Sequence, residues 1–459
     1  MRTLLFILFT GLVSLSFGQS KQDKELVKQV DQFITHKYPS YAPGCAVLIA
    51  KKGEVLLEKG YGTANIELNV PMQAGMVFRI GSITKQFTAV AILQLVEQGK
   101  MALTDSIQKF IPDFHFKGKT ITIEHLQTHT SGIKGYEEID AKLPNPMRID
   151  FSPKTVIDSL DRLSFEFEPG TRYNYSNSNY FILGYIIEKV SGQSYPQYLR
   201  ENLFKPAGLS STYYESHTDI IPNRASGYSY ADGKYLNTDF ISMSLVYGAG
   251  ALRSTVTDLY KWHKALYEGK LLKKETFLKA IQPYKLTDGK SIEYGYGFFN
   301  KSEYGINSIG HGGAIDGFRA LEMYYPEKDI FITVLCNSDR EDIERLYQSV
   351  AMIVLDIKNS IDMKEVKISR ETLSRYVGTY KNEQYKQTMT IQLGDSDRLY
   401  CTLSNGTGVN MVMIAQNDSL FLLPEVRRIR TTLQFVVENG KATKIIWTQE
   451  NTGEFIRVE

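Results

Sequence analysis

The segment FRIGSITKQFTAVAILQLVEQG, residues 78–99, places a serine three positions before a lysine at the start of a long apolar run. Apolar residues recur on nearly every face from Phe87 to Val96, which predicts a central, buried helix over Thr84–Gly99. Because residues three apart share one face of a helix, Ser82 and Lys85 fall within hydrogen-bonding reach of each other. The alternative interpretation is that Ser82 only caps this helix.

The same Ser-x-x-Lys spacing occurs in two other segments, SIQK at Ser106–Lys109 and SGIK at Ser131–Lys134. In the first, neighbouring apolar residues place the lysine on the solvated side. In the second, the glycine predicts a turn, so the three-residue spacing does not place the two side chains on one helix face. A serine hydroxyl becomes a nucleophile when a base takes its proton, and a lysine acts as that base when burial lowers its pKa. Of the three copies, the surroundings therefore favour Ser82 and Lys85 as the catalytic pair.

The composition is that of a soluble globular protein of two or three domains, with 459 residues, 42% hydrophobic and 23% charged. A formal net charge of +2 provides no long-range attraction to nucleic acid or to anionic membranes. Cys45, Cys336 and Cys401 lie in apolar, strand-like runs without metal-type spacing, so we expect buried thiols rather than disulfides. No metal and no cofactor are expected.

The N-terminal segment MRTLLFILFTGLVSLSFGQS has the three-part pattern of a secretory signal peptide. Arg2 precedes an apolar run from Leu4 to Leu15, and small residues follow at a position suited to cleavage before Gln19. An uncleaved anchor is the alternative, but the run is shorter than the roughly 20 residues of a spanning helix. We therefore expect a signal peptide over residues 1–18 and an exported bacterial protein, periplasmic or secreted, with no stable membrane span after cleavage.

Residues 22–357 predict one α+β domain, in which an antiparallel sheet is flanked by helices. A helix over 24–38 and two strands within 43–62 come first. Short strands between 294 and 338 and a helix over 342–357 come last. The segment between them is mostly helical, which predicts a sheet assembled from sequence-distant strands with a helical insertion packed beside it.

The remainder of the chain predicts a second, smaller unit. Residues 358–369 are polar and read as a linker. From residue 370 to 459 the helical period disappears, and alternating segments are separated by Asp, Asn and Gly turns. This pattern is typical of a small all-β domain, a barrel or a sandwich.

A second motif, Tyr175-Ser176-Asn177, lies in a polar loop ahead of a helix that we expect to be amphipathic. A phenol beside an ammonium group is easier to deprotonate, so Tyr175 is suited to shuttle protons. The amide of Asn177 is suited to hold a substrate carbonyl. The alternative is an aromatic turn, since the same Tyr-x-Asn spacing recurs at Tyr235–Asn237.

A third motif, His311-Gly312-Gly313, stands at the end of a predicted strand. Glycines at a strand end let a substrate backbone lie along the strand. The main-chain N–H of Ala314 would then face that of Ser82 as an oxyanion hole. The alternative is a glycine-rich strand end with a surface histidine.

In this order, the three motifs resemble those of the serine β-lactamase and penicillin-binding protein family, most closely its class C-like branch of D,D-peptidases, D-aminopeptidases and esterases. The resemblance covers about residues 25–356 and includes ITIEHLQTHTSGI and YGAGALRSTVTDL. The tail from YVGTY onward is similar to a lipocalin-like β-barrel module often appended to such proteins. The resemblance implies a β-lactamase/transpeptidase-like fold and a serine hydrolase that forms an acyl-enzyme on an ester, an amide or a D-amino-acid peptide.

The resemblance also implies a role for each motif residue. Ser82 is the acylated nucleophile, Lys85 its general base, and Tyr175 the proton shuttle to the leaving group and to the deacylating water. The other implied positions are Asn177, His311 and Gly313 for substrate binding and the main-chain N–H groups of Ser82 and Ala314 for the oxyanion hole. We find no counterpart of the class A glutamate that activates the deacylating water.

His311 stands where many relatives carry a lysine. An imidazole with a pKa of about 6.5 is mostly neutral at pH 7 and offers no permanent cation to a substrate carboxylate. We therefore expect slow or absent β-lactam hydrolysis and better activity on small esters or D-amino-acid amides. Two alternatives stay open, namely a non-catalytic binding or sensor protein for cell-wall peptides and a weak class C-like β-lactamase.

Other patterns carry less weight. His125 and His129 have an H-x-x-x-H spacing, but Leu126 stands where metalloprotease chemistry needs a glutamate, so we expect packed or hydrogen-bonded histidines. Asn174-Tyr175-Ser176 is a glycosylation sequon, which we interpret as accidental. The expected partner is a small-molecule or peptide substrate of possible cell-wall origin, and not nucleic acid.

Overall fold

The computed structural model describes residues 20–115, 118–139, 146–303, 305–340, 343–357, 366–384, 386–394, 397–404, 411–423, 431–448 and 452–458. The predicted signal peptide and most of the predicted linker lie outside the described residues. Among the helices of the described part, none combines the length and the apolar character that crossing a bilayer requires.

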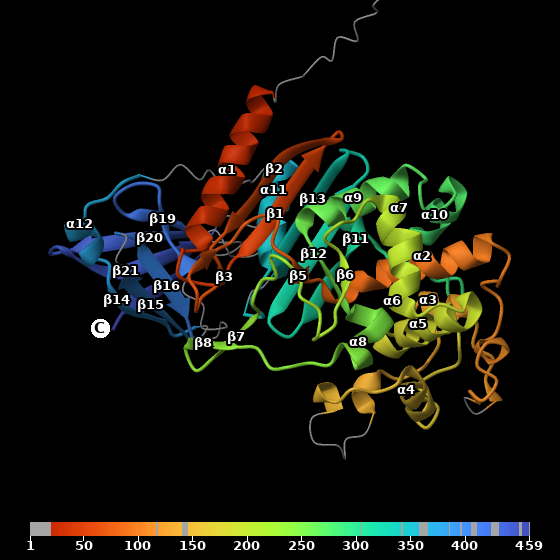
Figure 1. Cartoon of the computed structure of the whole chain (residues 1–459). Coiled ribbons are helices and arrows are strands. Elements are labelled where there is room, and N and C mark those ends of the chain that lie inside the picture. The colour runs from red at the N-terminus through yellow and green to blue at the C-terminus, as the bar shows by residue number, and fades with distance from the viewer. Residues whose placement is uncertain are drawn as a thin grey trace, which may run out of the picture.

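Within the described residues, six antiparallel strands form the main sheet in the order β10-β11-β12-β13-β1-β2. β1 pairs with β13 so that Cys45 lies opposite Cys336 and Lys51 opposite Ile330. Strands from the two ends of the domain therefore lie side by side (Figure 1), which confirms the predicted α+β sheet. The strands are β1 (Cys45–Lys51), β2 (Glu54–Tyr61), β10 (Phe299–Glu303), β11 (Ile306–Ile315), β12 (Phe318–Tyr325) and β13 (Ile330–Cys336).

The sheet separates two hydrophobic cores, because successive strand residues point to opposite faces. Val47 and Val334 pack on the face that is covered by α1 (Lys21–Lys37) and α11 (Ile343–Val354). Leu48 and Leu335 belong to the core on the other face, beneath the helical region. The cysteines of β1 and β13, together with Cys401, are buried free thiols, as predicted.

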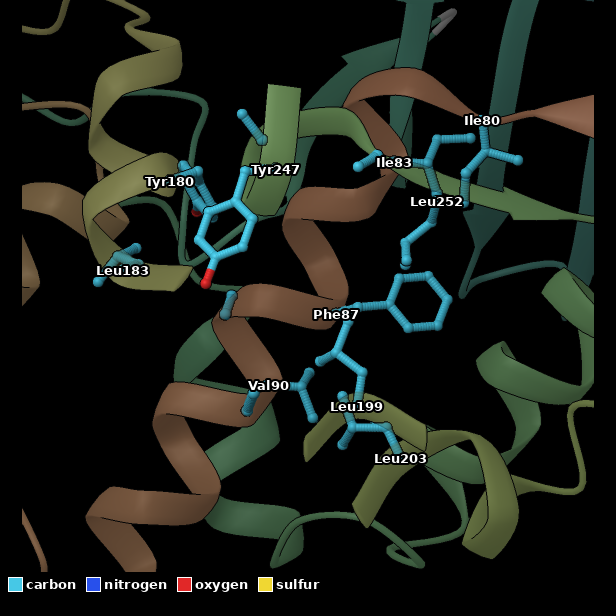
Figure 2. Close-up of a cluster of buried hydrophobic side chains, with 14 of the residues drawn as sticks. Ile80, Ile83, Phe87, Val90, Tyr180, Leu183, Leu199, Leu203, Tyr247 and Leu252 are labelled. Carbon is cyan, nitrogen blue, oxygen red and sulfur yellow. The ribbon is translucent and has the colours of Figure 1, made fainter. Parts of the chain in front are cut away.

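The helical region packs around α2, which carries the lysine of the first motif and directly follows the serine. Figure 2 shows Phe87 and Val90 of this helix among Leu199, Leu203 and Leu252. The central helices are α2 (Thr84–Glu97), α5 (Asn177–Ser191), α8 (Met243–Gly250) and α9 (Val256–Tyr267). The others are α3 (Ile123–Gln127), α4 (Pro153–Leu160), α6 (Tyr195–Leu199), α7 (Lys205–Ala207) and α10 (Lys274–Ala280).

The prediction that α5 is amphipathic is wrong for most of its length. Every residue from Ser178 to Ile187 is buried. The reason is that α2, α3 and α8 all contact α5, so that it lies inside the helical region and not at its surface.

Short strands and turns connect these elements. The pairing of β5 with β9 anchors the chain just before the first motif. The short strands are β3 (Thr63–Asn65), β4 (Val70–Pro71), β5 (Phe78–Arg79), β6 (Tyr213–Tyr214), β7 (Tyr228–Ala231), β8 (Lys234–Asn237) and β9 (Leu252–Ser254). The short helical turns are η1 (Gly81–Ile83), η2 (Ile107–Lys109), η4 (Tyr136–Glu138), η5 (Pro146–Arg148) and η6 (Arg200–Phe204).

The tail folds as a nearly closed β-barrel. In the described part of the tail, nine strands follow the order β17-β16-β15-β14-β22-β21-β20-β19-β18. Only Met413 separates the two edge strands, so the sheet curls until its edges meet. Buried side chains such as Tyr380, Phe421 and Phe435 fill the interior. The elements are α12 (Arg370–Ser374), β14 (Gly378–Asn382), β15 (Gln387–Leu393), β16 (Leu399–Leu403), β17 (Met411–Val412), β18 (Ile414–Ala415), β19 (Leu420–Leu423), β20 (Thr431–Glu438), β21 (Lys441–Thr448) and β22 (Thr452–Arg457).

The barrel docks on the side of the sheet that carries α1 (Figure 1). Ile414 and Leu422 join the core between α1 and the sheet. The Arg398 guanidinium donates to His36 Nε2 over 3.0 Å. The barrel therefore contacts the face opposite α2 and leaves the helical side of the domain to the candidate site.

Candidate active site

Ser82 lies where β5 leads into α2. Strand β9 holds the chain up to Arg79, and η1 then carries it directly into the helix. Gly81 has a φ of +49°, in the left-handed region that glycine adopts with little penalty. Neither η1 nor α2 begins with a side-chain cap hydrogen bond. The interpretation of Ser82 as a mere helix cap is therefore wrong.

Lys85 is fully buried, and its amine touches three oxygen atoms. Nζ lies 3.0 Å from Ser82 Oγ, 2.7 Å from Asn177 Oδ1 and 2.8 Å from the Ala249 carbonyl. Burial lowers the pKa of Lys85 well below its ordinary value, and the Glu137 carboxylate opposes this shift only in part. A neutral amine has two N–H donors and one lone pair. It can therefore donate to the amide and to the main-chain carbonyl while it accepts the serine proton.

The Ala249 carbonyl reaches Lys85 from a distorted helix. Tyr247, inside α8, has φ 40° and ψ −128°. Such a conformation costs a non-glycine residue about 1–3 kcal/mol, and strain of this kind clusters at functional sites. The Tyr247 ring, shown in Figure 2, packs 4.8 Å from the ring of Tyr195, measured between centroids, within the surrounding core. The sequence contains no periodic signal for this kink.

Tyr175 completes the group around the serine. Lys85 Nζ lies 4.8 Å from the centroid of its ring, and its phenol hydrogen-bonds with the Ser82 side chain. Burial raises the pKa of Tyr175 above its ordinary value, and the bond to Ser82 offsets this only in part. The prediction that a neighbouring ammonium makes this phenol easier to deprotonate is therefore wrong, because desolvation dominates. The phenol stays protonated at neutral pH and is suited to donate a proton.

Asn177 links the lysine to an acidic residue that the sequence analysis did not select. Its Oδ1 accepts from Lys85, and its Nδ2 donates to Glu137 Oε1 over 2.5 Å. These two bonds determine which end of the amide faces the amine. A Cβ on Gly135 would lie 2.1 Å from Glu137 Oε2, so a larger residue there would displace the flexible end of this carboxylate side chain. A single acidic residue in a polar loop carries no pattern, which is why Glu137 escaped prediction.

Two main-chain segments approach each other beside Ser82. A Cβ on Gly313 of β11 would lie 2.0 Å from the Ile80 carbonyl oxygen and 3.1 Å from the Ser82 nitrogen. A Cβ on Gly81 would lie 3.0 Å from the Ala314 nitrogen. Only glycine permits this approach, which brings together the two N–H groups of the predicted oxyanion hole.

His311 lies in β11 and is only 2% exposed, so the alternative of a surface histidine is wrong. Its Nδ1 lies 2.5 Å from the Gly312 carbonyl oxygen, which can only accept. The Nδ1 atom therefore carries the proton, and Nε2 accepts from the Tyr294 hydroxyl over 3.1 Å. Burial and the nearby Lys85 lower the pKa of His311 to about 3. The imidazole is neutral, and both of its nitrogens are engaged within the protein.

The two histidines of the H-x-x-x-H spacing are packed and hydrogen-bonded, as predicted. His125 accepts from the Thr122 N–H at the start of α3. His129 lies beyond the end of α3 and accepts from the Ser176 N–H over 3.1 Å. Its ring packs against the tilted ring of Tyr175 with 4.2 Å between centroids. His129 therefore helps to hold the Tyr175 ring in position.

Family models match both parts of the chain. A family model described as Beta-lactamase matches residues 30–353, and one described as Domain of unknown function (DUF3471) matches residues 362–458. The chain is similar to Penicillin-binding protein 4* of Bacillus subtilis (strain 168), with 26% identity over 89% of this chain and 93% of that protein.

Solved structures resemble the whole chain or a large part of it. The octameric penicillin-binding protein homologue from Pyrococcus abyssi superposes with a TM-score of 0.63 and 26% identity, covering 95% of this chain and 99% of that one. D-amino acid amidase from Ochrobactrum anthropi SV3, complexed with D-phenylalanine, has a TM-score of 0.62 at 24% identity, over 74% of this chain and 100% of its own. At that identity the second likeness concerns the fold alone.

Proposed function

The chain belongs to the Beta-lactamase family of penicillin-binding-protein-like serine hydrolases, and from that premise we propose that it hydrolyses an ester, an amide or a D-amino-acid peptide through an acyl-enzyme on Ser82. One observation carries the proposal. Lys85 Nζ lies 3.0 Å from Ser82 Oγ in a fully buried position. A desolvated amine in contact with a hydroxyl is the arrangement that activates a serine.

Acylation begins when Ser82 Oγ transfers its proton to the neutral amine of Lys85. Asn177 and the Ala249 carbonyl hold the two N–H groups of that amine, so its lone pair is directed at the hydroxyl. The Oγ atom then attacks the substrate carbonyl carbon. The developing oxyanion accepts hydrogen bonds from the main-chain N–H groups of Ser82 and Ala314. Donors that are fixed in place stabilise the charge that develops in the transition state.

The leaving group departs with a proton from Tyr175, whose raised pKa keeps the phenol protonated. The Lys85 ammonium, 4.8 Å from the phenol ring, returns a proton to this site. In deacylation the roles reverse, and a water molecule loses its proton to the same pair. This cycle needs no additional carboxylate base.

Substrate binding is assigned to Asn177, His311 and Gly313. The glycine lets the substrate lie along β11, and the amide of Asn177 faces the reacting carbonyl. The role of His311 is to shape the site, because both of its nitrogens are engaged. It offers no cation to the carboxylate of a β-lactam, which supports slow β-lactam hydrolysis.

A different class of function is a binding or sensor protein for cell-wall peptides that does not turn them over. The buried amine of Lys85 disfavours this alternative, because a pure binder gains nothing from an unsolvated lysine in contact with a serine. A weak class C-like β-lactamase is the second alternative, and a chromogenic cephalosporin tests it directly.

The experiment is active-site labelling combined with an ester assay. We expect a fluorophosphonate probe to label the wild-type protein and the Ser131→Ala variant but not Ser82→Ala. We expect p-nitrophenyl acetate hydrolysis to follow the same order, and the cephalosporin to be turned over slowly or not at all. Equal labelling of Ser82→Ala and wild type would contradict the proposal, and fast cephalosporin turnover would favour the β-lactamase alternative.

We also propose that the enzyme acts outside the cytoplasm, since residues 1–18 have the pattern of a cleaved signal peptide. Its substrate would then be a small molecule or a peptide, including one derived from the cell wall. Fractionation of an expressing bacterium, with N-terminal sequencing of the mature protein, tests both export and cleavage before Gln19.

A further inference from the structure

The N-terminal strands are held in the main sheet by a single seam, at which residues 45–51 of β1 pair with residues 330–336 of β13. Within the described residues, β2 pairs only with β1 in this sheet, and β1 pairs with β13 on its other side. Cys45 lies directly opposite Cys336 at one end of the seam. The two cysteines come from opposite ends of the domain's sequence, so a covalent bond between them would close almost the whole domain into one loop.

The hydrogen bonds at the two ends of the seam determine how closely the cysteines approach each other. The Asn337 N–H donates to the Gly44 carbonyl over 3.2 Å, and the Lys52 N–H donates to the Asp329 carbonyl over 2.8 Å. Because hydrogen-bonded and non-hydrogen-bonded pairs alternate along an antiparallel ladder, both bonds assign the two cysteines to a non-hydrogen-bonded pair. The Cα atoms of such a pair lie about 4.5 Å apart. Disulfides join Cα atoms roughly 4.4–6.8 Å apart, so a disulfide can span the seam at this pair.

A closed core surrounds the two thiols. Both side chains lie between the sheet, α1 and α11 and are inaccessible to solvent. Tyr38, at the end of α1, has its hydroxyl 3.7 Å from Cys336 Sγ. Tyr61 of β2 lies opposite Cys45 on the other side of β1, and its hydroxyl donates to Asp31 of α1 over 2.8 Å. A disulfide at this pair would therefore form before the core closes, and the closed core would then protect it from reductants.

We propose that Cys45 and Cys336 are an oxidation site, at which a cross-strand disulfide forms when the chain folds in an oxidising compartment. One S–S bond forms and two S–H bonds break. The two protons pass to solvent, and the two electrons reduce the disulfide of a thiol–disulfide oxidoreductase or of oxidised glutathione to two thiols. The structure holds the pair in the thiol form that precedes this step. The sequence-based expectation of buried thiols then applies to the pair before oxidation, and to Cys401 throughout, because Cys401 lies in the separate core of the barrel.

The bond would fix residues 21–71 to the rest of the domain at the one seam that holds them in the main sheet. A disulfide stabilises a fold mainly by restricting the unfolded chain, and the restriction increases with the length of the closed loop. The export proposed above would deliver the chain to an oxidising compartment, where such bonds persist. The inference goes beyond the proposed hydrolysis, since no residue of the candidate active site takes part in it.

The test counts thiols in the whole protein. Protein from the envelope of an expressing bacterium, and protein refolded from urea in a buffer of reduced and oxidised glutathione, are denatured and alkylated with N-ethylmaleimide. In both samples we expect mass spectrometry to find alkylated Cys401 and a non-reduced peptide pair that joins Cys45 to Cys336. The double variant Cys45→Ala with Cys336→Ala should lose the linked pair, whereas the control Cys401→Ala should retain it.

Thermal unfolding gives a second readout. Wild-type protein refolded with the glutathione buffer should unfold roughly 5–10 °C above wild-type protein refolded with a reductant alone. The double variant should unfold at the same temperature in both buffers, and Cys401→Ala should show the wild-type difference.

The outcomes separate this inference from the proposed function. Three alkylated cysteines in the refolded or the exported protein, or a linked pair that contains Cys401, would overturn the inference. A linked pair without a change in the unfolding temperature would overturn the stabilising role of the bond. Labelling of Ser82 in the same samples reports on the hydrolase alone, so its absence from disulfide-linked protein would contradict the proposed function and leave this inference standing.

Discussion

Two copies of one spacing behave differently in this molecule. At Ser82–Lys85, the amine is fully buried and lies 3.0 Å from the serine oxygen. At Ser131–Lys134, the serine hydroxyl donates to Asn179 Oδ1 over 2.6 Å, and the lysine extends outward to Glu138. The difference shows that a three-residue spacing brings side chains together only when a helix sets their direction and a core desolvates them.

The third copy agrees with this rule. Ser106 stands ahead of the short turn η2 with an extended backbone, and Lys109 pairs with Asp105 over 2.7 Å. More than half of the lysine side chain is exposed, at 54%. The amine of this copy is therefore held by a carboxylate at the surface and is not buried in a core.

The largest expected effect comes from removing the amine of the buried copy. Lys85→Met keeps the apolar stem but leaves Ser82 without a base, so we expect ester kcat/KM to fall by roughly 10²–10⁴-fold. Lys134→Met is the matched control and should stay within about twofold of wild type. Circular dichroism verifies that both variants fold. Equal losses in the two variants would break the distinction between the copies.

The pH dependence sharpens the same distinction. The base of the first copy works when it is deprotonated, so activity is present above its pKa and is lost as the pH falls through that value. Because burial lowers the pKa of Lys85 below the ordinary 10.5, we expect the rising limb of kcat/KM to lie well below pH 10.5. A limb centred at the ordinary lysine value would contradict a buried base.

The next effect concerns strand β11, which lies beside Ser82. A Cβ on Gly313 would meet the Ile80 carbonyl oxygen at 2.0 Å, whereas one on Gly312 would meet only Leu321 Cδ1 at 3.3 Å and the Ala320 oxygen at 3.8 Å. We expect Gly313→Ala to displace the Ala314 N–H and lower kcat by roughly 10²–10³-fold, the usual loss for one oxyanion donor.

Gly312→Ala serves as the control for this prediction. Its new methyl group meets a flexible leucine end, so we expect a loss below about tenfold. Steady-state kinetics on p-nitrophenyl acetate measure both variants. A larger loss in Gly312→Ala than in Gly313→Ala would argue against β11 as a wall of the site.

Tyr175→Phe tests the proton donor of the first copy. A p-nitroanilide leaves as a poor group that needs a proton, whereas p-nitrophenolate leaves without one. We therefore expect roughly a 10²-fold loss on the anilide and a clearly smaller loss on the ester. Identical losses on both substrates would indicate a structural role for the phenol.

The smallest expected effect concerns stability around the buried copy. Glu322 of β12 is buried beside α2 and accepts from the Gln86 side chain, and burial raises the pKa of its carboxyl to about 8. In the unfolded chain the carboxyl titrates near 4.5. Between these values the folded protein holds a proton that the unfolded chain has released, so the free energy of unfolding falls as the pH rises through this window.

Urea unfolding between pH 5 and pH 8 measures this effect. Glu322→Gln should lose the part of the pH dependence that belongs to Glu322, whereas Glu138→Gln, at the exposed copy, should follow the wild-type curve. If the free energy of unfolding changed with pH between pH 5 and pH 8 in the same way in Glu322→Gln and in the wild-type protein, the assignment would be contradicted.

Much of this arrangement was predictable from the sequence because it depends on short-range periodicity. The apolar run of α2 determines that Lys85 is buried and that it faces Ser82 one turn away. Short, continuous apolar runs indicate that β1 and β13 are strands with two buried faces. The change of period after residue 370 indicates a separate β domain. The order of the three motifs narrows the function to one class of hydrolase.

The tertiary structure decided the contacts that no local period encodes. Lys85 and the Ala249 carbonyl are 164 positions apart, and Asn177 and Glu137 are 40 apart. The hydrogen bond that Tyr294 makes to His311, and the burial that keeps Tyr175 protonated, likewise follow from packing. The sequence specifies which side chains can do chemistry, but distance and desolvation between remote segments arise only when the layers close, and these two quantities set the pKa values on which the proposed reaction depends.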